Sequence, residues 1–100
     1  MKFDKNKFIK TNNQFLYNKL CDFLECEKNS YKEIIHILLC ENMKSFMYEG
    51  NQYLLTKNEK SSQILIADEI ARENGVSDSQ CAFIIKKNEL LELIINKKDR

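Results

Sequence analysis

Proline is absent from this 100-residue sequence, and glycine occurs only twice. Because these two residues mark most turns and loops, their scarcity argues against a loop-rich or all-β fold and favours long helices. The longest apolar run, residues 34–40, is broken by His36 and is too short to cross a bilayer. Sixteen basic residues nearly balance fifteen acidic ones, so the sequence is neither a strongly basic coat for nucleic acid nor an acidic tail.

The length and the remaining composition fit one globular domain over residues 1–100. Hydrophobic residues make up 43% and charged residues 31%, a composition typical of a folded rather than a disordered chain. Four cysteines without a recognisable signal peptide indicate a reducing compartment, not a disulfide scaffold. We therefore expect a cytoplasmic protein without a membrane partner.

Charge is distributed unevenly along the chain. Residues 1–20 carry five lysines and one aspartate, whereas residues 21–50 carry three lysines and six acidic residues. Residues 1–10 form a basic N-terminal arm that could contact phosphate or an acidic partner. A solvated, frayed terminus is the more common role of such an arm.

The first half of the sequence predicts two helices. Apolar residues recur at helical spacing between residues 15 and 24, after Asn12 or Asn13 as N-cap, so a helix should run to residues 27–29. Ser30 and Glu33 form a capping-box pattern before a second helix over residues 31–39, which is apolar on most sides and belongs in the core. A buried strand is the alternative for this short run.

The second half predicts a hairpin and two further helices. Residues 46–48 and 53–56 resemble short strands around Gly50 and Asn51, which can both adopt positive φ. A third helix should start after Ser61 or Ser62 and run over residues 64–74, with Gly75 as its C-terminal cap. The capping-box pattern of residues 77–80 should start a fourth helix. The predicted fold class is mainly α with a small β-hairpin.

The junction between the third and fourth predicted helices resembles the helix-turn-helix family. The positions of internal contacts would be filled by Ile70, Ala71, Gly75, Val76, Cys81 and Ile84. Residues 86–100 resemble the basic pair, strand and charged wing of winged members, so the helix-turn-helix-like region spans residues 62–100. Asn88 and Glu92 depart from the winged pattern, and residues 90–95 could equally extend the helix and form a dimerisation surface.

The resemblance implies a DNA-binding transcriptional regulator that binds double-stranded DNA as a homodimer through the first two helices or residues 90–95. The fourth helix would present its first turns to the major groove, and lysines would contact phosphates. The implied DNA-binding residues are Ser77, Ser79, Gln80, Phe83, Lys86, Lys87, Lys97 and Lys98. Arg100, Lys57 and Lys60 are further candidates for phosphate contacts.

An alternative from another class is a small protein-protein interaction module. Asp78 would repel phosphate in the reading turn, arginine occurs only twice, and the net charge is near zero. These features weigh against DNA binding. The near-neutral charge, the acidic stretch of residues 21–50 and the compact size favour a protein partner, so the alternative function is an inhibitor or accessory factor of a larger complex, encoded by a phage or mobile element.

A metal site and an enzymatic site are the remaining possibilities. Cys21, Cys26, His36 and Cys40 have a spacing that suggests zinc, with His36 and Cys40 on one helix face. On a continuous helix, however, Cys21 and Cys26 point roughly 140° apart, so buried free thiols are favoured. No nucleophile–base pair, carboxylate pair or glycine-rich phosphate loop is recognisable from the spacing of the residues. We expect no catalytic residues, no metal and no cofactor.

Overall fold

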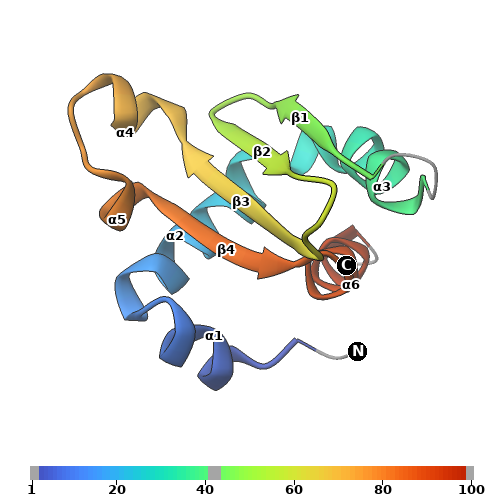
Figure 1. Ribbon diagram of the computed structural model, residues 1–100, viewed down its shortest axis with the longest axis horizontal. Coiled ribbons are helices and arrows are strands. Elements are labelled where there is room, and N and C mark those ends of the chain that lie inside the picture. The colour runs from blue at the N-terminus through green and yellow to red at the C-terminus, as the bar shows by residue number, and fades with distance from the viewer. Residues whose placement is uncertain (1–2, 41–43, 99–100) are drawn as a thin grey trace.

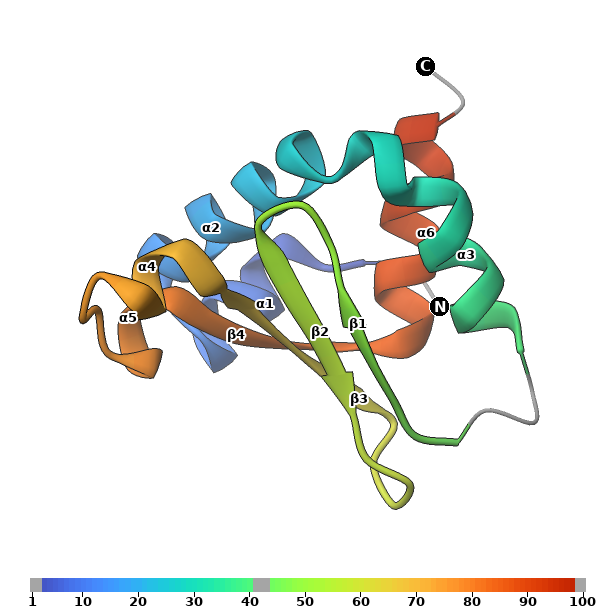
Figure 2. The ribbon, with the colours of Figure 1, turned by 90° about the horizontal axis from the view of Figure 1, so that it is seen from above.

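Four antiparallel strands in the order β1-β2-β3-β4 form the centre of the fold, and helices cover one of the two faces of the sheet (Figures 1 and 2). The computed structural model describes residues 3–40 and 44–98. The strands are β1 (Phe46–Glu49), β2 (Tyr53–Lys57), β3 (Gln63–Asp68) and β4 (Ala82–Lys86). The helices are α1 (Lys5–Thr11), α2 (Gln14–Cys26), η1 (Lys28–Ser30), α3 (Tyr31–Leu39), α4 (Glu69–Glu73), α5 (Asp78–Cys81) and α6 (Lys87–Lys98).

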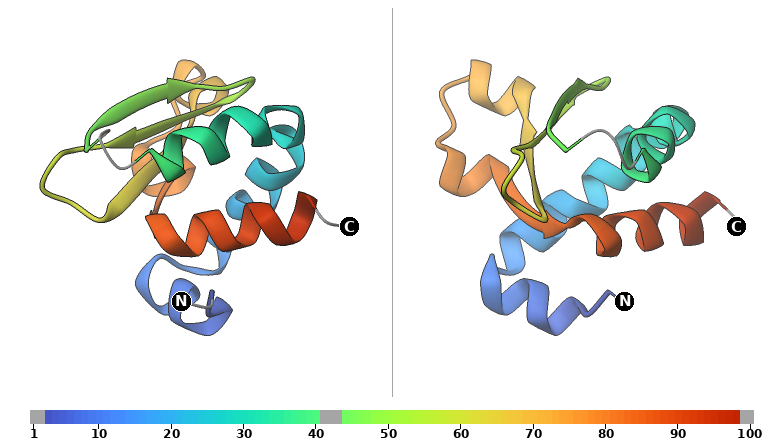
Figure 3. Two further views of the ribbon diagram at one scale, coloured as in Figure 1. Left: turned by 90° about the vertical axis from the view of Figure 1, so that its right-hand side faces the viewer. Right: turned by 45° about the vertical axis from the view of Figure 1, so that its right-hand side comes forward.

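The core lies between the covered face of the sheet and three helices. Side chains alternate along each strand, and the set that faces the helices comprises Phe46, Tyr48, Tyr53, Leu55, Ile64, Ile66, Phe83 and Ile85. Helix α2 contributes Phe23, whose ring centroid lies 5.4 Å from that of Tyr53. Helices α3 and α6 lie beside each other (Figure 3) and bury Leu38 and Ile94 in the same cluster. In the described part of the chain, no helix has the length and apolar character needed to span a membrane.

The two helices predicted in the first half are confirmed, but the central position expected for the second helix is wrong, because α3 buries only Tyr31, Ile34 and Leu38. Helices α2 and α3 match the two predicted segments, and Asn13 caps α2 by accepting a hydrogen bond of 2.7 Å from the N–H of Leu16. The Ser30 side chain does not cap α3 and instead donates to Glu27 at 3.5 Å. The N-terminal arm also contains a helix, α1, which buries Phe8 and is capped by Asp4.

The predicted fold class, mainly α with a small hairpin and a helix-turn-helix, is wrong. Residues 63–68, expected in the third helix, form β3, and residues 82–86, expected in the fourth helix, form β4. Each strand pairs antiparallel with its neighbour, so the backbone groups of these segments form hydrogen bonds within the sheet. The same pairing buries alternate apolar residues, which are Ile64, Ile66, Phe83 and Ile85. The fold is a mixed α+β fold with a four-stranded sheet.

The two glycines have different roles. Gly75 has a φ of +87° and ends α4 as predicted, since its N–H and that of Val76 bond to the carbonyls of Arg72 and Ala71 at 3.0 Å each. The positive φ expected at Gly50 and Asn51 is wrong, because Gly75 alone has positive φ among the described residues. A Cβ at Gly50 would lie 2.5 Å from Glu27 Oε1, so glycine is needed there for close approach to a carboxylate.

Candidate protein-interaction surface

The structure separates the residues expected to read DNA bases. Ser77, Ser79 and Gln80 are exposed on or beside the one-turn helix α5. Phe83 is 1% exposed, and its ring centroid lies 5.7 Å from that of Phe8 in the core. The side chain of Phe83 is therefore packed in the core, and the helix that follows the turn at Gly75 is the four-residue α5.

The predicted phosphate-contact lysines divide into two groups. Lys86 and Lys87 lie at the far end of β4 from Gln80, across a five-residue strand that is about 16 Å long at 3.3 Å per residue. Lys97 is exposed near the C-terminal end of α6. Lys98 is placed in α6, but its side chain and Arg100 lie outside the described parts of the structure.

Lys86 and Lys87 come together with Lys57 and Lys60 around one hollow of about 580 Å³, which we call the lysine hollow. Its other lining residues are Glu59, Ser61, Ser62 and Asn88. None of the ion pairs among the described residues involves these four lysines. The Lys57 ammonium is fixed by the carbonyls of Lys44 at 2.6 Å and Asn58 at 3.3 Å. This arrangement attracts anions but has no geometry that would read a base sequence.

The face of the sheet opposite the helices carries a row of exposed apolar side chains. Cross-strand register places Met47 opposite Thr56, Thr56 opposite Leu65, and Leu65 opposite Ile84. Met47 is 73% exposed, Leu65 37% and Ile84 42%. We call Met47, Leu65 and Ile84, together with Thr56 that lies between Met47 and Leu65, the apolar row. The row crosses all four strands on the face opposite the helices. Figure 2 shows the arrangement of the helices and the sheet.

The two edges of the sheet differ. At the β4 edge, Asn12 acts as a substitute strand, because its Nδ2 donates to the carbonyl of Ile84 and its Oδ1 accepts from the N–H of Ile84, both at 3.2 Å. The β1 edge has no such cover among the described residues. Antiparallel geometry directs the main-chain groups of Phe46 and Tyr48 toward β2, so those of Met47 and Glu49 point away from the sheet.

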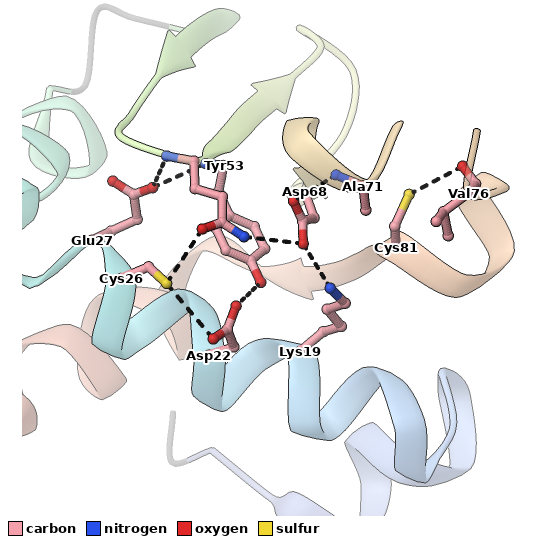
Figure 4. A network of polar contacts seen from close by, with 10 residues as sticks. Lys19, Asp22, Cys26, Glu27, Tyr53, Asp68, Ala71, Val76 and Cys81 are labelled. Carbon is pink, nitrogen blue, oxygen red and sulfur yellow. Dashed lines mark hydrogen bonds and ion pairs between the residues drawn. The ribbon is translucent and has the colours of Figure 1, made fainter. Parts of the chain in front are cut away.

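A buried carboxylate holds the β1–β2 turn against α2 (Figure 4). Glu27 is 0% exposed and accepts hydrogen bonds from three consecutive backbone N–H groups. The distances are 2.8 Å from Asn51, 2.7 Å from Gln52 and 2.9 Å from Tyr53. Every oxygen of this carboxylate is engaged in fixing the turn, so Glu27 acts as a clamp between helix and hairpin.

A second polar group in Figure 4 joins α2 to the end of β3. Asp68 accepts from Lys19 Nζ at 2.6 Å, from the N–H of Ala71 at 3.1 Å and from Gln52 Nε2 at 3.2 Å. Burial alone would raise the pKa of Asp68, but these hydrogen bonds outweigh burial and lower the pKa. The Asp68 carboxylate is therefore held in its charged form.

The neighbouring thiol and phenol are held in their neutral forms. Burial, with Asp22 nearby, raises the pKa of Cys26. Burial also raises the pKa of Tyr53, whose hydroxyl donates to Asp22 at 2.5 Å. Because a neutral thiol is a weak nucleophile, this network connects structural elements rather than activating a reacting group.

The residues considered for zinc do not converge. Within residues 3–40 and 44–98, no three His, Cys, Asp or Glu side chains lie close enough together to hold a metal ion. Cys21 is exposed, Cys26 and Cys40 are half-buried, and Cys81, which the sequence placed inside the angle of two helices, is buried beside the carbonyl of Val76 at 3.7 Å. All four are free thiols.

No protein-family model matches this chain, and neither curated proteins nor solved structures include a significant match. The apolar row was missed at the level of sequence because residues 63–68 were assigned to a helix. The available signal was the alternation in that segment, where Ile64 and Ile66 flank Leu65 as they would in a strand.

Proposed function

We propose that this protein is a non-enzymatic interaction module that acts as an inhibitor or accessory factor of a larger complex and docks through its open sheet face. The observation that carries this proposal is the apolar row, in which Met47, Leu65 and Ile84 remain exposed although the opposite face of the same strands is packed. Large aliphatic side chains that are exposed together on one face of a small protein mark an interaction site more often than singly scattered ones do.

The physical basis of docking is removal of this row from water. Fully burying a large aliphatic side chain contributes about 1.5–3 kcal/mol relative to leaving it exposed, so three partly exposed side chains supply a few kcal/mol at the centre of an interface. The polar corners of the same face, Glu49 and Lys86, would lie at the rim. The net charge of +1 neither attracts nor repels a partner strongly. The four free thiols suit the cytoplasmic location that we propose for the module.

The test is a comparison of captured partners between two variants with the same change in charge. Tagged wild-type protein, Leu65→Lys and Asn29→Lys would each be incubated with lysate of the source cells. Leu65 lies in the apolar row, whereas Asn29 is exposed on η1 outside the sheet. A partner retained by wild type and Asn29→Lys but lost with Leu65→Lys supports the proposal. Equal retention by all three proteins, at equal thermal stability, contradicts it.

A second candidate function, binding of double-stranded DNA through its phosphates, is favoured by the lysine hollow. Four lysines and one glutamate are among the residues that line this hollow. A protein that neutralises phosphates loses affinity steeply as salt rises, with a slope of about −0.9 per phosphate contacted. This binding would position the protein without reading sequence and would not use a recognition helix.

The DNA candidate is tested by a salt titration of duplex binding with two double variants. Lys60→Gln combined with Lys87→Gln removes two charges from the lysine hollow, and Lys28→Gln combined with Lys32→Gln removes two exposed charges elsewhere. The first pair should flatten the salt slope by about 2 units, and the second should leave it unchanged. Equal slopes for both pairs, or no binding by wild type at low salt, would reject this candidate.

A further inference from the structure

The β1 edge has the hydrogen-bonding pattern of an incomplete sheet. The N–H of Gly50 donates to the carbonyl of Tyr53 at 2.9 Å, which fixes the alternation along β1. Inward groups therefore belong to Phe46 and Tyr48, and outward groups to Met47 and Glu49. No partner among the described residues satisfies these outward N–H and C=O groups, while Asn12 satisfies the corresponding groups of Ile84 at the opposite edge. An uncovered edge of this kind is a template for another strand.

An apolar groove lies beside this edge, on the side of the sheet where α3 packs. The groove has a volume of about 710 Å³ and is lined by Tyr48 of β1 and by residues of α3. Its apolar α3 residues are Ile35, Ile37 and Leu39, and its polar ones are Lys32, Glu33 and His36. Leu39 is 60% exposed. A strand added to β1 would direct alternate side chains into this groove.

We propose that the β1 edge and the α3 groove together form an interface between two copies of this chain. In this interface β1 pairs antiparallel with β1 of the second copy, and the two-fold axis passes beside Tyr48. Met47 of each copy then bonds through both of its main-chain groups to Glu49 of the other, which gives four hydrogen bonds in all. The two sheets join into one continuous sheet of eight strands.

Three features of the edge favour a second copy as the occupant. A two-fold axis at Tyr48 pairs each outward group with a complementary one, so the edge satisfies itself without any other sequence. The Tyr48 side chains face each other as a non-hydrogen-bonded pair, the closer of the two antiparallel pair types, on the α3 side. The groove carries both charge signs, with Lys32 and Glu33 adjacent, so an identical rim offers each charge an opposite one.

The size of the edge explains why the groove is required. Pairing of four-residue strands alone buries far less than the roughly 1,200 Å² typical of a stable interface. The exposed side chains of Leu39 and Met47 extend the contact on the two sides of the new strand pair. This interface shares Met47 with the apolar row but does not include Leu65 and Ile84, which lie on the open face and do not line the groove.

The experiment combines sedimentation with amide hydrogen exchange on the wild-type protein. Sedimentation velocity between about 1 µM and 1 mM protein should show a reversible monomer–dimer equilibrium. The amides of Met47 and Glu49 should exchange more slowly at the concentration where the dimer forms, whereas the amide of Ile84 should not change. A monomer across the whole range, or a dimer in which Met47 and Glu49 are not protected, would overturn the proposal.

A proline substitution tests the edge directly. Met47→Pro removes an N–H that points away from β2, so the β1–β2 ladder is kept while two of the four intercopy hydrogen bonds are lost. The dimer dissociation constant should rise at least about tenfold relative to the matched control Met47→Ala, which keeps the N–H. Leu39→Lys should weaken the dimer through the groove without touching the strand.

Leu65→Lys separates this interface from the open-face proposal. It should leave the dimer intact while removing a partner that docks on the apolar row. If Leu65→Lys abolishes the dimer and Met47→Pro does not, the two copies meet through the open face and the edge interface is wrong.

Discussion

Replacing Glu27 by alanine removes the acceptor that fixes the β1–β2 turn to α2. The carboxylate accepts from the N–H groups of Asn51, Gln52 and Tyr53 at 2.7–2.9 Å and is 0% exposed. Hydrogen bonds to a charged group contribute about 1.5–3 kcal/mol each, and water can replace part of this at the exposed Asn51. The expected loss is therefore about 3–5 kcal/mol, or roughly 12–40 °C in melting temperature for a domain of this size.

The assay is urea unfolding followed by circular dichroism, with Glu25→Ala as the matched control. Glu25 lies in α2 two residues before Glu27, is exposed, and forms an ion pair with Lys28 at 3.3 Å. A surface pair of this kind contributes less than about 0.5 kcal/mol, so the control should unfold at nearly the wild-type midpoint. If the free energies of unfolding of Glu27→Ala and Glu25→Ala differ by less than about 1 kcal/mol, the Glu27 carboxylate does not hold the turn.

Three further predictions follow from the core and the polar network. Phe83→Ala should lower the free energy of unfolding by about 3–5 kcal/mol, measured by urea denaturation, because Phe83 lies on β4 in the core. A change near zero would show that this side chain is not buried. The lowered pKa of Asp68 means that its contribution to stability is present above its unfolded-state pKa and is lost as pH falls through the folded-state value. Asp68→Asn should accordingly have a lower free energy of unfolding than wild type at pH 7, and its free energy of unfolding should fall less steeply below about pH 4. If the free energies of unfolding of the two proteins fall in parallel as pH falls, this prediction is contradicted. The raised pKa of Tyr53 predicts that wild type and Tyr53→Phe give the same increase in phenolate absorbance up to about pH 11 while both remain folded; a larger increase in wild type would show that this phenol ionises normally.

Local sequence signals predicted the elements whose periodicity agrees with their packing. Helix α2 combines an Asn13 cap with a single apolar face, and the cap and the turn at Gly75 are both found where the sequence placed them. The β1–β2 hairpin was also predicted, but positive φ at Gly50 and Asn51, the reason given for its turn, is not found. Gly50 is required by the approach of Glu27, a contact between residues 23 positions apart that no local pattern contains.

The second half was misassigned because its residues satisfy helical and strand patterns at once. Ile70, Ala71, Val76 and Cys81 have helix-turn-helix spacing, yet Ile70 is 50% exposed. Pairing of β3 with both β2 and β4 decided the outcome, and this pairing depends on long-range partners that periodicity does not show. The candidate site was missed with it, because the apolar row exists only once four strands are in register.

The surfaces expected to form a dimer differ in how much of their apolar area is exposed. Residues 90–95 lie in α6, and Leu90 and Ile94 are both 0% exposed in the core of the same chain. In α2, Leu20 and Phe23 are likewise buried, whereas Phe15 is 53% exposed. Exposed apolar side chains remain on each surface first considered for dimerisation, at Phe15, Leu39 and Ile95. The outer side of α3 also lies beside the β1 edge, which no partner among the described residues covers.

Photo-crosslinking at position 65 tests the docking function most directly. A photoreactive amino acid in place of Leu65 would be compared, in the source cells, with the same residue in place of the exposed Asn29. The open-face proposal predicts one discrete crosslinked protein from position 65 and none from position 29. Two results would contradict this proposal. One is the same set of crosslinks from positions 65 and 29. The other is no crosslink from position 65 together with crosslinks from a photoreactive residue placed at position 79 on α5.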